Sequence, residues 1–190
     1  PDTPSPFYML VEVSGSNEEH NKAKLDDFLA SVMDKGLVTN GVMSQDDTHV
    51  KQLWALREGV AEAANHEGVH YAYDVSLPVR KFNGLIQELR TRVGDRGEVL
   101  EYGHLGDGNL HVSVTGRKYS QDVVDLIEPF IWERTAECKG SISAEHGLGA
   151  TKSRHLHYSK SPAAVDVMKR LKKLMDPHTI LNPYKVLPYN

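Results

Sequence analysis

The sequence predicts an α+β fold in which an antiparallel sheet carries helices on one face. Short apolar runs of strand length alternate along the chain with longer segments whose apolar residues recur at spacings of three and four. The resulting order is strand, helix, strand, helix, strand, helix, strand, strand, helix, a mixture typical of an α+β layer. With 190 residues, the chain can bury one sizeable core, or one domain plus an appended segment.

The N-terminal part of the chain is expected to hold three strands and two helices. Strands are predicted at Phe7–Ser14, Val38–Met43 and Val69–Leu77, the last because bulky apolar residues alternate there with smaller or polar ones. Helices are expected from Asn17 to Gly36 and from Asp46 to Gly68, because a capping side chain begins each and a glycine ends each.

Two more strands and two more helices are predicted in the middle of the chain. The strands Val99–Tyr102 and His111–Val114 flank a glycine-rich turn. One helix is expected after Pro78. Another begins after Ser120, and Pro129 is expected to kink it because proline removes a helix hydrogen bond.

The character of the sequence changes after Ala150. Residues 151–161 are basic, rich in histidine and without periodicity, and one more helix is predicted across Ala164–Leu174. The irregular tail from Asp176 to Asn190 contains three prolines. We therefore expect two parts, a domain at residues 1–150 and a C-terminal segment at residues 151–190.

Composition excludes several classes of function. Basic and acidic residues number 22 and 26, for a formal net charge of -4, and no basic stripe is present, so nucleic acid is not an expected partner. No apolar run approaches the roughly 20 residues of a membrane span, and no signal or transit peptide is visible. The single Cys138 excludes an internal disulfide and suits a reducing compartment or the mitochondrial interior. The chain opens at Pro1 without a Met, which suggests a fragment of a longer protein.

The most informative segment is Tyr102-Gly-His-Leu-Gly-Asp-Gly-Asn-Leu-His111, which places two imidazoles on either side of a glycine-rich turn. A tight reversal of the chain at Asp107-Gly108 lets His104 and His111 converge. Histidine is the commonest metal ligand, so this pair indicates a metal site. The alternative is a pair of ordinary hydrogen-bonded histidines beside a turn.

A second glycine-rich segment, Ser143-Ala-Glu-His-Gly-Leu-Gly149, offers a carboxylate, Glu145, as the third ligand. Two histidines and one carboxylate with an open position form a typical catalytic metal site, and ligation without cysteine fits zinc, manganese or cobalt. The adjacent His146 is a candidate general base or substrate contact, although Glu145 and His146 could instead cap a local turn. Neither glycine segment has the spacing of a dinucleotide or phosphate loop.

Arg57 is the third candidate site residue. It falls within the apolar stripe of its predicted helix, where an unpaired cation is costly to bury. Its guanidinium suits bidentate binding of a substrate carboxylate. The alternatives are an internal ion pair, with Asp74 or a nearby Glu, or a side chain whose charged end reaches solvent.

These motifs together resemble the C-terminal half of FAD-dependent 2-hydroxyacid dehydrogenases, the FAD-binding oxidase/transferase type 4 group of the vanillyl-alcohol oxidase flavoprotein superfamily. The resemblance covers nearly the whole chain. Beyond the two glycine-rich segments, it is carried by Trp54-Ala-Leu-Arg-Glu58, Tyr73-Asp-Val-Ser-Leu-Pro78, Ile180-Leu-Asn-Pro-Tyr-Lys185 and the segment from Phe7 to Ser16.

The resemblance implies a division of labour. Residues 1–150 are expected to be a ferredoxin-like cap domain that binds substrate, and residues 151–190 are expected to return to an N-terminal FAD domain that this chain lacks. By resemblance, His104, His111 and Glu145 bind zinc, His146 contacts substrate and serves as the catalytic base, Arg57 holds a substrate carboxylate, and Asn182 lies near the flavin.

The implied reaction is oxidation of D-2-hydroxyglutarate to 2-oxoglutarate by hydride transfer to FAD, with zinc polarising the C2 hydroxyl. An electron-transfer flavoprotein or a quinone is the implied electron acceptor. The implied location is the mitochondrial matrix in a eukaryote and otherwise the cytoplasm. Without the FAD domain, we expect the chain alone to be inactive.

Three positions depart from the family pattern. Close relatives usually carry Lys at the position of Ala72, Asn at that of Ser113 and, in some cases, Thr at that of Ala61. All three positions are associated with substrate contacts in the relatives. Another D-2-hydroxy acid, such as D-lactate or D-malate, is therefore an alternative substrate, and a non-catalytic metal-binding module is an alternative function.

Overall fold

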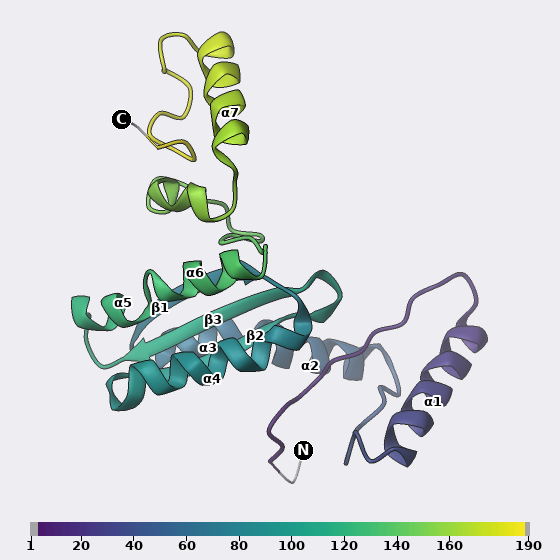
Figure 1. Cartoon of the computed structure of the whole chain (residues 1–190). Coiled ribbons are helices and arrows are strands. Elements are labelled where there is room, and N and C mark those ends of the chain that lie inside the picture. Colours follow the sequence, from purple (N-terminus) through teal and green to yellow (C-terminus); the bar gives the residue numbers. More distant parts are fainter. Residues whose placement is uncertain (1–3, 189–190) are drawn as a thin grey trace. The chain divides into compact units, whose positions relative to one another are not determined.

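The computed structural model describes residues 4–188, so residues 1–3 and 189–190 at the ends of the predicted ranges lie outside it. The described residues divide between Val60 and Ala61 into two compact units (Figure 1). The helices are α1 (Glu18–Asp34), α2 (Asp47–Glu58), α3 (Val60–His66), α4 (Phe82–Val93), α5 (Gln121–Ile127), α6 (Phe130–Glu137) and α7 (Pro162–Met175). The strands are β1 (Val69–Ser76), β2 (Glu98–His104) and β3 (Asn109–Gly116). Short 3₁₀ helices are η1 (Val79–Lys81), η2 (Gly94–Arg96), η3 (Leu105–Asp107) and η4 (Ser153–Tyr158).

The first unit contains α1 and α2, and both begin at their predicted caps. The side chain of Asn17 accepts a hydrogen bond from the backbone of His20, and that of Asp46 accepts one from the backbone of His49. The prediction of one continuous helix from Asp46 to Gly68 was wrong. Gly59 interrupts it, because glycine is among the weakest helix formers, and α3 begins as a separate helix.

The two strands predicted in the first unit are not formed. Phe7–Ser14 and Val38–Met43 have no strand ladder, and Phe7, Tyr8 and Met9 are each about two-thirds exposed. The apolar pattern of these segments is that of a strand, but a strand also needs a hydrogen-bonding neighbour. Within the described part of the first unit, no such neighbour is present.

The second unit is built on an antiparallel sheet of three strands in the order β1-β3-β2, with Tyr73 opposite Val112 and Tyr102 opposite His111. Since β1 and β2 both run antiparallel to β3, they are parallel to each other, and α4 makes the crossover between them. This is the split β-α-β arrangement of ferredoxin-like folds. The α+β prediction is confirmed, as are the three strands predicted in this unit, each within two residues at either end.

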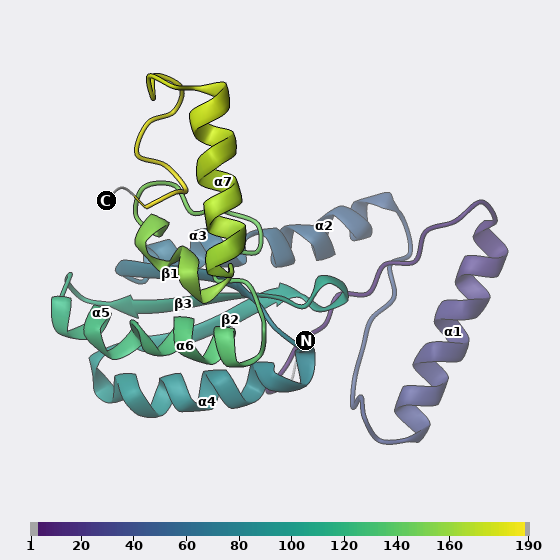
Figure 2. The ribbon, with the colours of Figure 1, turned by 45° about the horizontal axis from the view of Figure 1, so that its top comes forward.

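One face of the sheet is apolar and is covered by α4, α5 and α6 (Figure 2). The helix predicted to kink at Pro129 is instead two helices, because the chain leaves the helical conformation between Ile127 and Phe130. The core is formed by the buried side chains of Tyr71, Tyr73, Val75, Leu110, Val112, Val114, Leu85, Ile86, Leu89, Val93, Val123, Ile127, Ile131 and Trp132.

The opposite face of the sheet is polar. Paired residues of antiparallel strands share a face, and so do alternate residues along a strand. The apolar side chains Tyr73 and Val112 point to the core, which places Asp74, His111 and Tyr102 on the other face. Helix α3 lies along this face and is connected to β1 by a hydrogen bond that Nδ1 of His70 donates to Oδ1 of Asn65 (Figure 2).

The C-terminal segment contains η4, α7 and an irregular tail. Helix α7 contains the predicted Ala164–Leu174 segment and is capped by Ser161, whose side chain accepts a hydrogen bond from the backbone of Ala164. The tail folds back against the end of α7, where Asp176 accepts hydrogen bonds from the amides of Ile180 and Leu181, at 2.9 Å each. None of the helices in residues 4–188 combines the length and the apolar character needed to cross a bilayer.

Candidate metal centre

The hairpin between β2 and β3 brings the two predicted histidines together. Gly108 adopts the left-handed conformation (φ 63°), and its carbonyl accepts a hydrogen bond of 3.0 Å from Leu77. The reversal leaves the rings of His104 and His111 5.9 Å apart between centroids. The predicted tight turn is therefore confirmed, with η3 forming its first half.

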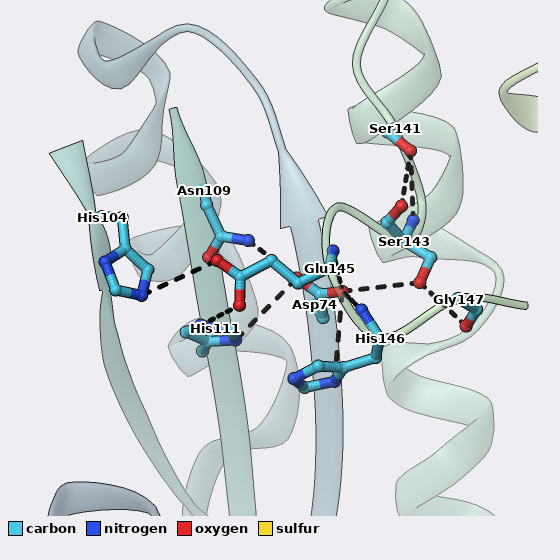
Figure 3. A network of polar contacts seen from close by, with 9 residues as sticks. All are labelled: Asp74, His104, Asn109, His111, Ser141, Ser143, Glu145, His146 and Gly147. Carbon is cyan, nitrogen blue, oxygen red and sulfur yellow. Dashed lines mark hydrogen bonds and ion pairs between the residues drawn. The ribbon is translucent and has the colours of Figure 1, made fainter. Parts of the chain in front are cut away.

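Glu145 reaches the same place from the loop that follows α6 (Figure 3). Its Oε1 lies 3.7 Å from Nε2 of His104, and its Oε2 lies 3.6 Å from Nε2 of His111. Each of the three residues offers one ligand atom, and these three atoms all lie within 4.8 Å of one another. The structure thus gathers the three predicted ligands, at separations longer than direct hydrogen bonds.

The carboxylate of Asp74 holds the loop that carries Glu145. Its Oδ2 accepts hydrogen bonds of 2.8 Å from the backbone amides of both Glu145 and His146, and its Oδ1 accepts one of 2.9 Å from Asn109. Asp74 is completely buried. Burial raises the pKa of its carboxyl, but the donors from His146, Glu145 and Asn109 outweigh burial, and the pKa lies below the ordinary value. Asp74 therefore stays ionised inside the domain.

A second connection fixes the start of the same loop. Ser76 at the end of β1 exchanges backbone hydrogen bonds with Ser141, at 2.9 and 3.0 Å. Gly140 passes so close to β1 that an added Cβ would overlap the carbonyl oxygen of Ser76. Any side chain at that position would push the loop, and with it Glu145, away from the sheet.

His111 is buried and is prepared for ligation. Burial lowers its pKa, while the carboxylates of Asp74 and Glu145 raise it, and the net shift is downward. A neutral imidazole is the form that binds a metal. Its Nδ1 has no hydrogen-bond partner and faces Oδ1 of Asp74 at 3.8 Å, while its Nε2 faces Glu145. A carboxylate behind the non-ligating nitrogen is the usual support of a histidine ligand.

His146 lies at the edge of the cluster with its side chain about half exposed (54%). Its ring stacks on that of His111, with centroids 5.2 Å apart, and its Nδ1 lies 4.0 Å from Oδ2 of Asp74. His146 therefore has features of both alternatives, a turn residue and a substrate contact. Its backbone amide donates to the Asp74 carboxylate, and its side chain is accessible to a ligand.

The donor set, two imidazoles and one carboxylate, is of a kind that zinc, manganese or cobalt accepts. The two oxygens of Glu145 face different histidines, Oε1 at 3.7 Å from Nε2 of His104 and Oε2 at 3.6 Å from Nε2 of His111. The side chains of His104 and Glu145 are both 45% exposed, so a fourth ligand has access from solvent.

Other predicted residues lie elsewhere. Arg57 sits half-buried in the last turn of α2, in the first unit. Asn182 is exposed on the tail and lines an open hollow of about 340 Å³ beside α7. Cys138 caps the C-terminal end of α6 and packs partly buried against the core, as expected of a structural thiol.

The role of Asp74 was not predicted from the sequence, where Asp74 was considered only as an ion-pair partner of Arg57. The available signal was an acidic residue between two core-facing apolar residues of the strand, Tyr73 and Val75. That pattern shows that Asp74 faces away from the core, but it does not reveal which loop its carboxylate meets.

The chain is similar to known proteins over nearly its whole length. Residues 1–186 match the family of FAD linked oxidases, C-terminal domain. The chain is 52% identical over 188 residues to a probable mitochondrial D-2-hydroxyglutarate dehydrogenase of Oryza sativa subsp. japonica, covering 99% of this chain and 34% of that protein. It is 51% identical over 185 residues to the mitochondrial D-2-hydroxyglutarate dehydrogenase of Rattus norvegicus, covering 97% of this chain and 35% of the relative.

A more distant relative is the D-2-hydroxyglutarate–pyruvate transhydrogenase of Saccharomyces cerevisiae, 39% identical with 95% of this chain and 38% of that protein covered. The chain thus spans about a third of the length of the curated relatives it matches. The match to the family nevertheless extends over nearly the whole chain. The chain belongs to the family of the C-terminal domains of FAD-linked oxidases.

Proposed function

We propose that this chain is the substrate- and metal-binding part of an FAD-dependent dehydrogenase that oxidises D-2-hydroxyglutarate to 2-oxoglutarate. The observation that carries the proposal is the convergence of two imidazoles and one carboxylate beside the partly exposed His146, in a chain of this family. The names of the relatives support this substrate.

In the proposed site, His104, His111 and Glu145 hold the metal. Zinc bound there would lower the pKa of a substrate hydroxyl, as it does for bound water. Asp74 keeps the Glu145 loop on the sheet through its amide hydrogen bonds and faces Nδ1 of His111. These contacts orient the ligands before any substrate arrives.

His146 is the proposed base. The Asp74 carboxylate next to its Nδ1 favours a proton on that nitrogen, which leaves the lone pair of Nε2 for the hydroxyl proton of the substrate. Stacking on His111 keeps the ring beside the metal ligands. The flavin, when bound, would accept the hydride from C2.

Other parts of the proposal rest on residue type and similarity alone. Arg57 is proposed to bind a substrate carboxylate and Asn182 to lie near the flavin. Residues 1–150 are proposed to act as the cap domain, and residues 151–190 to contact an FAD domain that precedes them in the complete protein. A mitochondrial location follows the names of the relatives, and an electron-transfer flavoprotein is the proposed acceptor.

The test is reduction of an artificial dye by the full-length, flavin-containing protein. We expect turnover with D-2-hydroxyglutarate, loss of that turnover after removal of metal with a chelator, and recovery on addition of zinc. D-malate and D-lactate serve as alternative substrates in the same assay. A metal-containing protein that oxidises none of these acids would instead support a non-catalytic metal-binding module.

A further inference from the structure

The ring of Tyr102 lies against the imidazole of His111, the buried member of the candidate ligand set. The two residues stand directly opposite each other on β2 and β3. Their ring centroids are 4.9 Å apart, with an interplanar angle of 31°. This separation is within the range in which aromatic side chains attract each other. Tyr102 is half-buried, so the contact is partly shielded from solvent.

No hydrogen bond among the described residues fixes the ring of His111. Its Nδ1 has no hydrogen-bond partner and lies 3.8 Å from Oδ1 of Asp74, while its Nε2 lies 3.6 Å from Oε2 of Glu145. Both distances are too long for a hydrogen bond. Rotation of a histidine ring about its Cβ–Cγ bond has only broad intrinsic preferences. The orientation of His111 therefore depends on the side chains that pack against its ring.

Three aromatic rings lie close to that of His111, and they differ in how firmly they are held. His146 stacks on it at 5.2 Å, but it comes from a loop and its side chain is 54% exposed. His104 meets it edge-on at 5.9 Å and is itself a candidate ligand at the last residue of β2. Tyr102 is the nearest of the three and lies within the paired part of β2.

The backbone beside Tyr102 brings β2 close to β3. A Cβ at the next residue, Gly103, would overlap the carbonyl oxygen of Asn109. The two strands thus approach more closely at this point than a side chain would permit. Because the strand ladder holds the backbone of Tyr102, its ring forms a fixed surface beside His111 before any metal is bound.

We propose that Tyr102 is a positioning residue of the candidate metal centre, and that its aromatic ring holds the imidazole of His111 in the orientation that presents Nε2 to the metal. This inference rests on the proposed function and adds a residue that acts through a ligand. Without the ring, the imidazole of His111 can rotate more freely, and metal binding must restrict that rotation at a cost in affinity. The role belongs to the ring of Tyr102 and not to its hydroxyl.

The test is a competition titration of the full-length, flavin-containing protein with a zinc indicator. A second measurement is the visible absorption spectrum of the cobalt-substituted protein, which depends on the geometry of the ligands. In Tyr102→Leu, which removes the ring but keeps an apolar side chain, we expect zinc affinity to fall about 10-fold and the cobalt bands to change. Tyr102→Phe keeps the ring and should match the wild type in zinc affinity, cobalt spectrum and turnover of D-2-hydroxyglutarate.

Two further variants complete the experiment. Tyr119→Leu is the matched control, because it also removes a ring that packs on an aromatic side chain, that of Tyr71 at 5.8 Å, and it should bind zinc as the wild type does. Tyr102→Val introduces a residue that suits a strand and repeats the removal of the ring where Tyr102→Leu folds poorly.

The outcomes separate this inference from the proposed function. Zinc affinity and cobalt bands that stay unchanged in the variants without a ring would overturn the inference alone. An equal loss of affinity in Tyr102→Phe would also overturn it, because the hydroxyl would then be responsible. A wild type that binds no divalent metal would overturn the candidate metal centre and the inference together. A wild type that binds zinc but oxidises no hydroxy acid would overturn the proposed reaction, while the titrations would still decide the role of Tyr102.

Discussion

The carboxylate of Asp74 connects the sheet to the loop that carries Glu145. It is buried, ionised and bonded to two backbone amides of that loop, and it stands behind Nδ1 of His111. One residue therefore supports a ligand from the hairpin and a ligand from the loop at the same time. A neutral side chain of the same shape would keep the packing but lose the negative charge.

For this reason we expect Asp74→Asn to weaken zinc binding by about 10- to 100-fold, the usual cost of losing a group that orients metal ligands. The measurement is a competition titration of the full-length protein with a zinc indicator. Asp95→Asn, at an exposed position within η2, is the matched control and should bind zinc as the wild type does. Equal zinc affinity in Asp74→Asn and wild type would show that Asp74 has no part in holding the site.

Among the elements, the β2–β3 hairpin depends on one glycine. Gly108 has a φ of +63°, and a Cβ there would lie 2.9 Å from the carbonyl oxygen of Leu77. Gly106 in the same turn has open space around it and no positive φ. The two glycines are thus two residues apart but differ in what a methyl group would do.

We expect Gly108→Ala to lower the free energy of unfolding by about 1–2 kcal/mol, the cost of the left-handed conformation for a residue with a Cβ, and to weaken zinc binding by moving His104 away from His111. Gly106→Ala should leave both properties close to those of the wild type. Chemical denaturation and the zinc titration check the pair. Equal effects of the two substitutions would contradict the role assigned to Gly108.

At the end of α7, Asp176 holds the start of the C-terminal tail, residues 177–182, through hydrogen bonds. Its Oδ2 accepts a hydrogen bond of 2.6 Å from Nζ of Lys172, and its two oxygens accept from the amides of Ile180 and Leu181. The hydrogen bond from Lys172 contributes most to a pKa below the ordinary value, against the effect of burial, and the two amides lower it further. The charged form of Asp176 is therefore the one that the folded tail favours.

Because the folded pKa is lowered, the contribution of Asp176 is complete above its ordinary pKa of about 3.9 and is lost as the pH falls through the lower, folded pKa. Hydrogen exchange of the 177–182 segment, corrected for the intrinsic rate, should show protection at neutral pH that declines below about pH 4. In Asp176→Asn the protection should already be reduced at neutral pH. Protection that is independent of pH in the wild type would contradict this account.

The elements that the sequence predicted well are those with local signals. Caps at Asn17 and Asp46 and the glycine turn at Gly108 depend on neighbours a few residues away, so they could be located from the sequence. The predicted strands at 7–14 and 38–43 did not form, because an alternating pattern does not provide a pairing partner.

The candidate site was also predictable only in part, namely in the residues that offer ligand atoms. Its ligand residues came from two short motifs, and the structure brings them together. The support given by Asp74 was not predictable, because its amide partners lie 71 and 72 positions away in sequence.

At the scale of the whole molecule, the proposed reaction is divided between two domains. In that proposal this chain supplies the metal ligands and the site for the hydroxy acid, and a flavin held mostly by another domain accepts the electrons. The two faces of the sheet have different roles. The apolar face forms the core that stabilises the domain, and the polar face carries every residue of the candidate metal centre that lies on a strand.

The central claim is that His104, His111 and Glu145 hold a metal ion, and the metal content of the purified full-length protein tests it most directly. We predict one zinc per chain in the wild type and in His66→Ala, an exposed control, and a loss of most of that zinc in His104→Ala. A wild-type protein that neither contains nor takes up a divalent metal would contradict the account, as would full retention of zinc by His104→Ala.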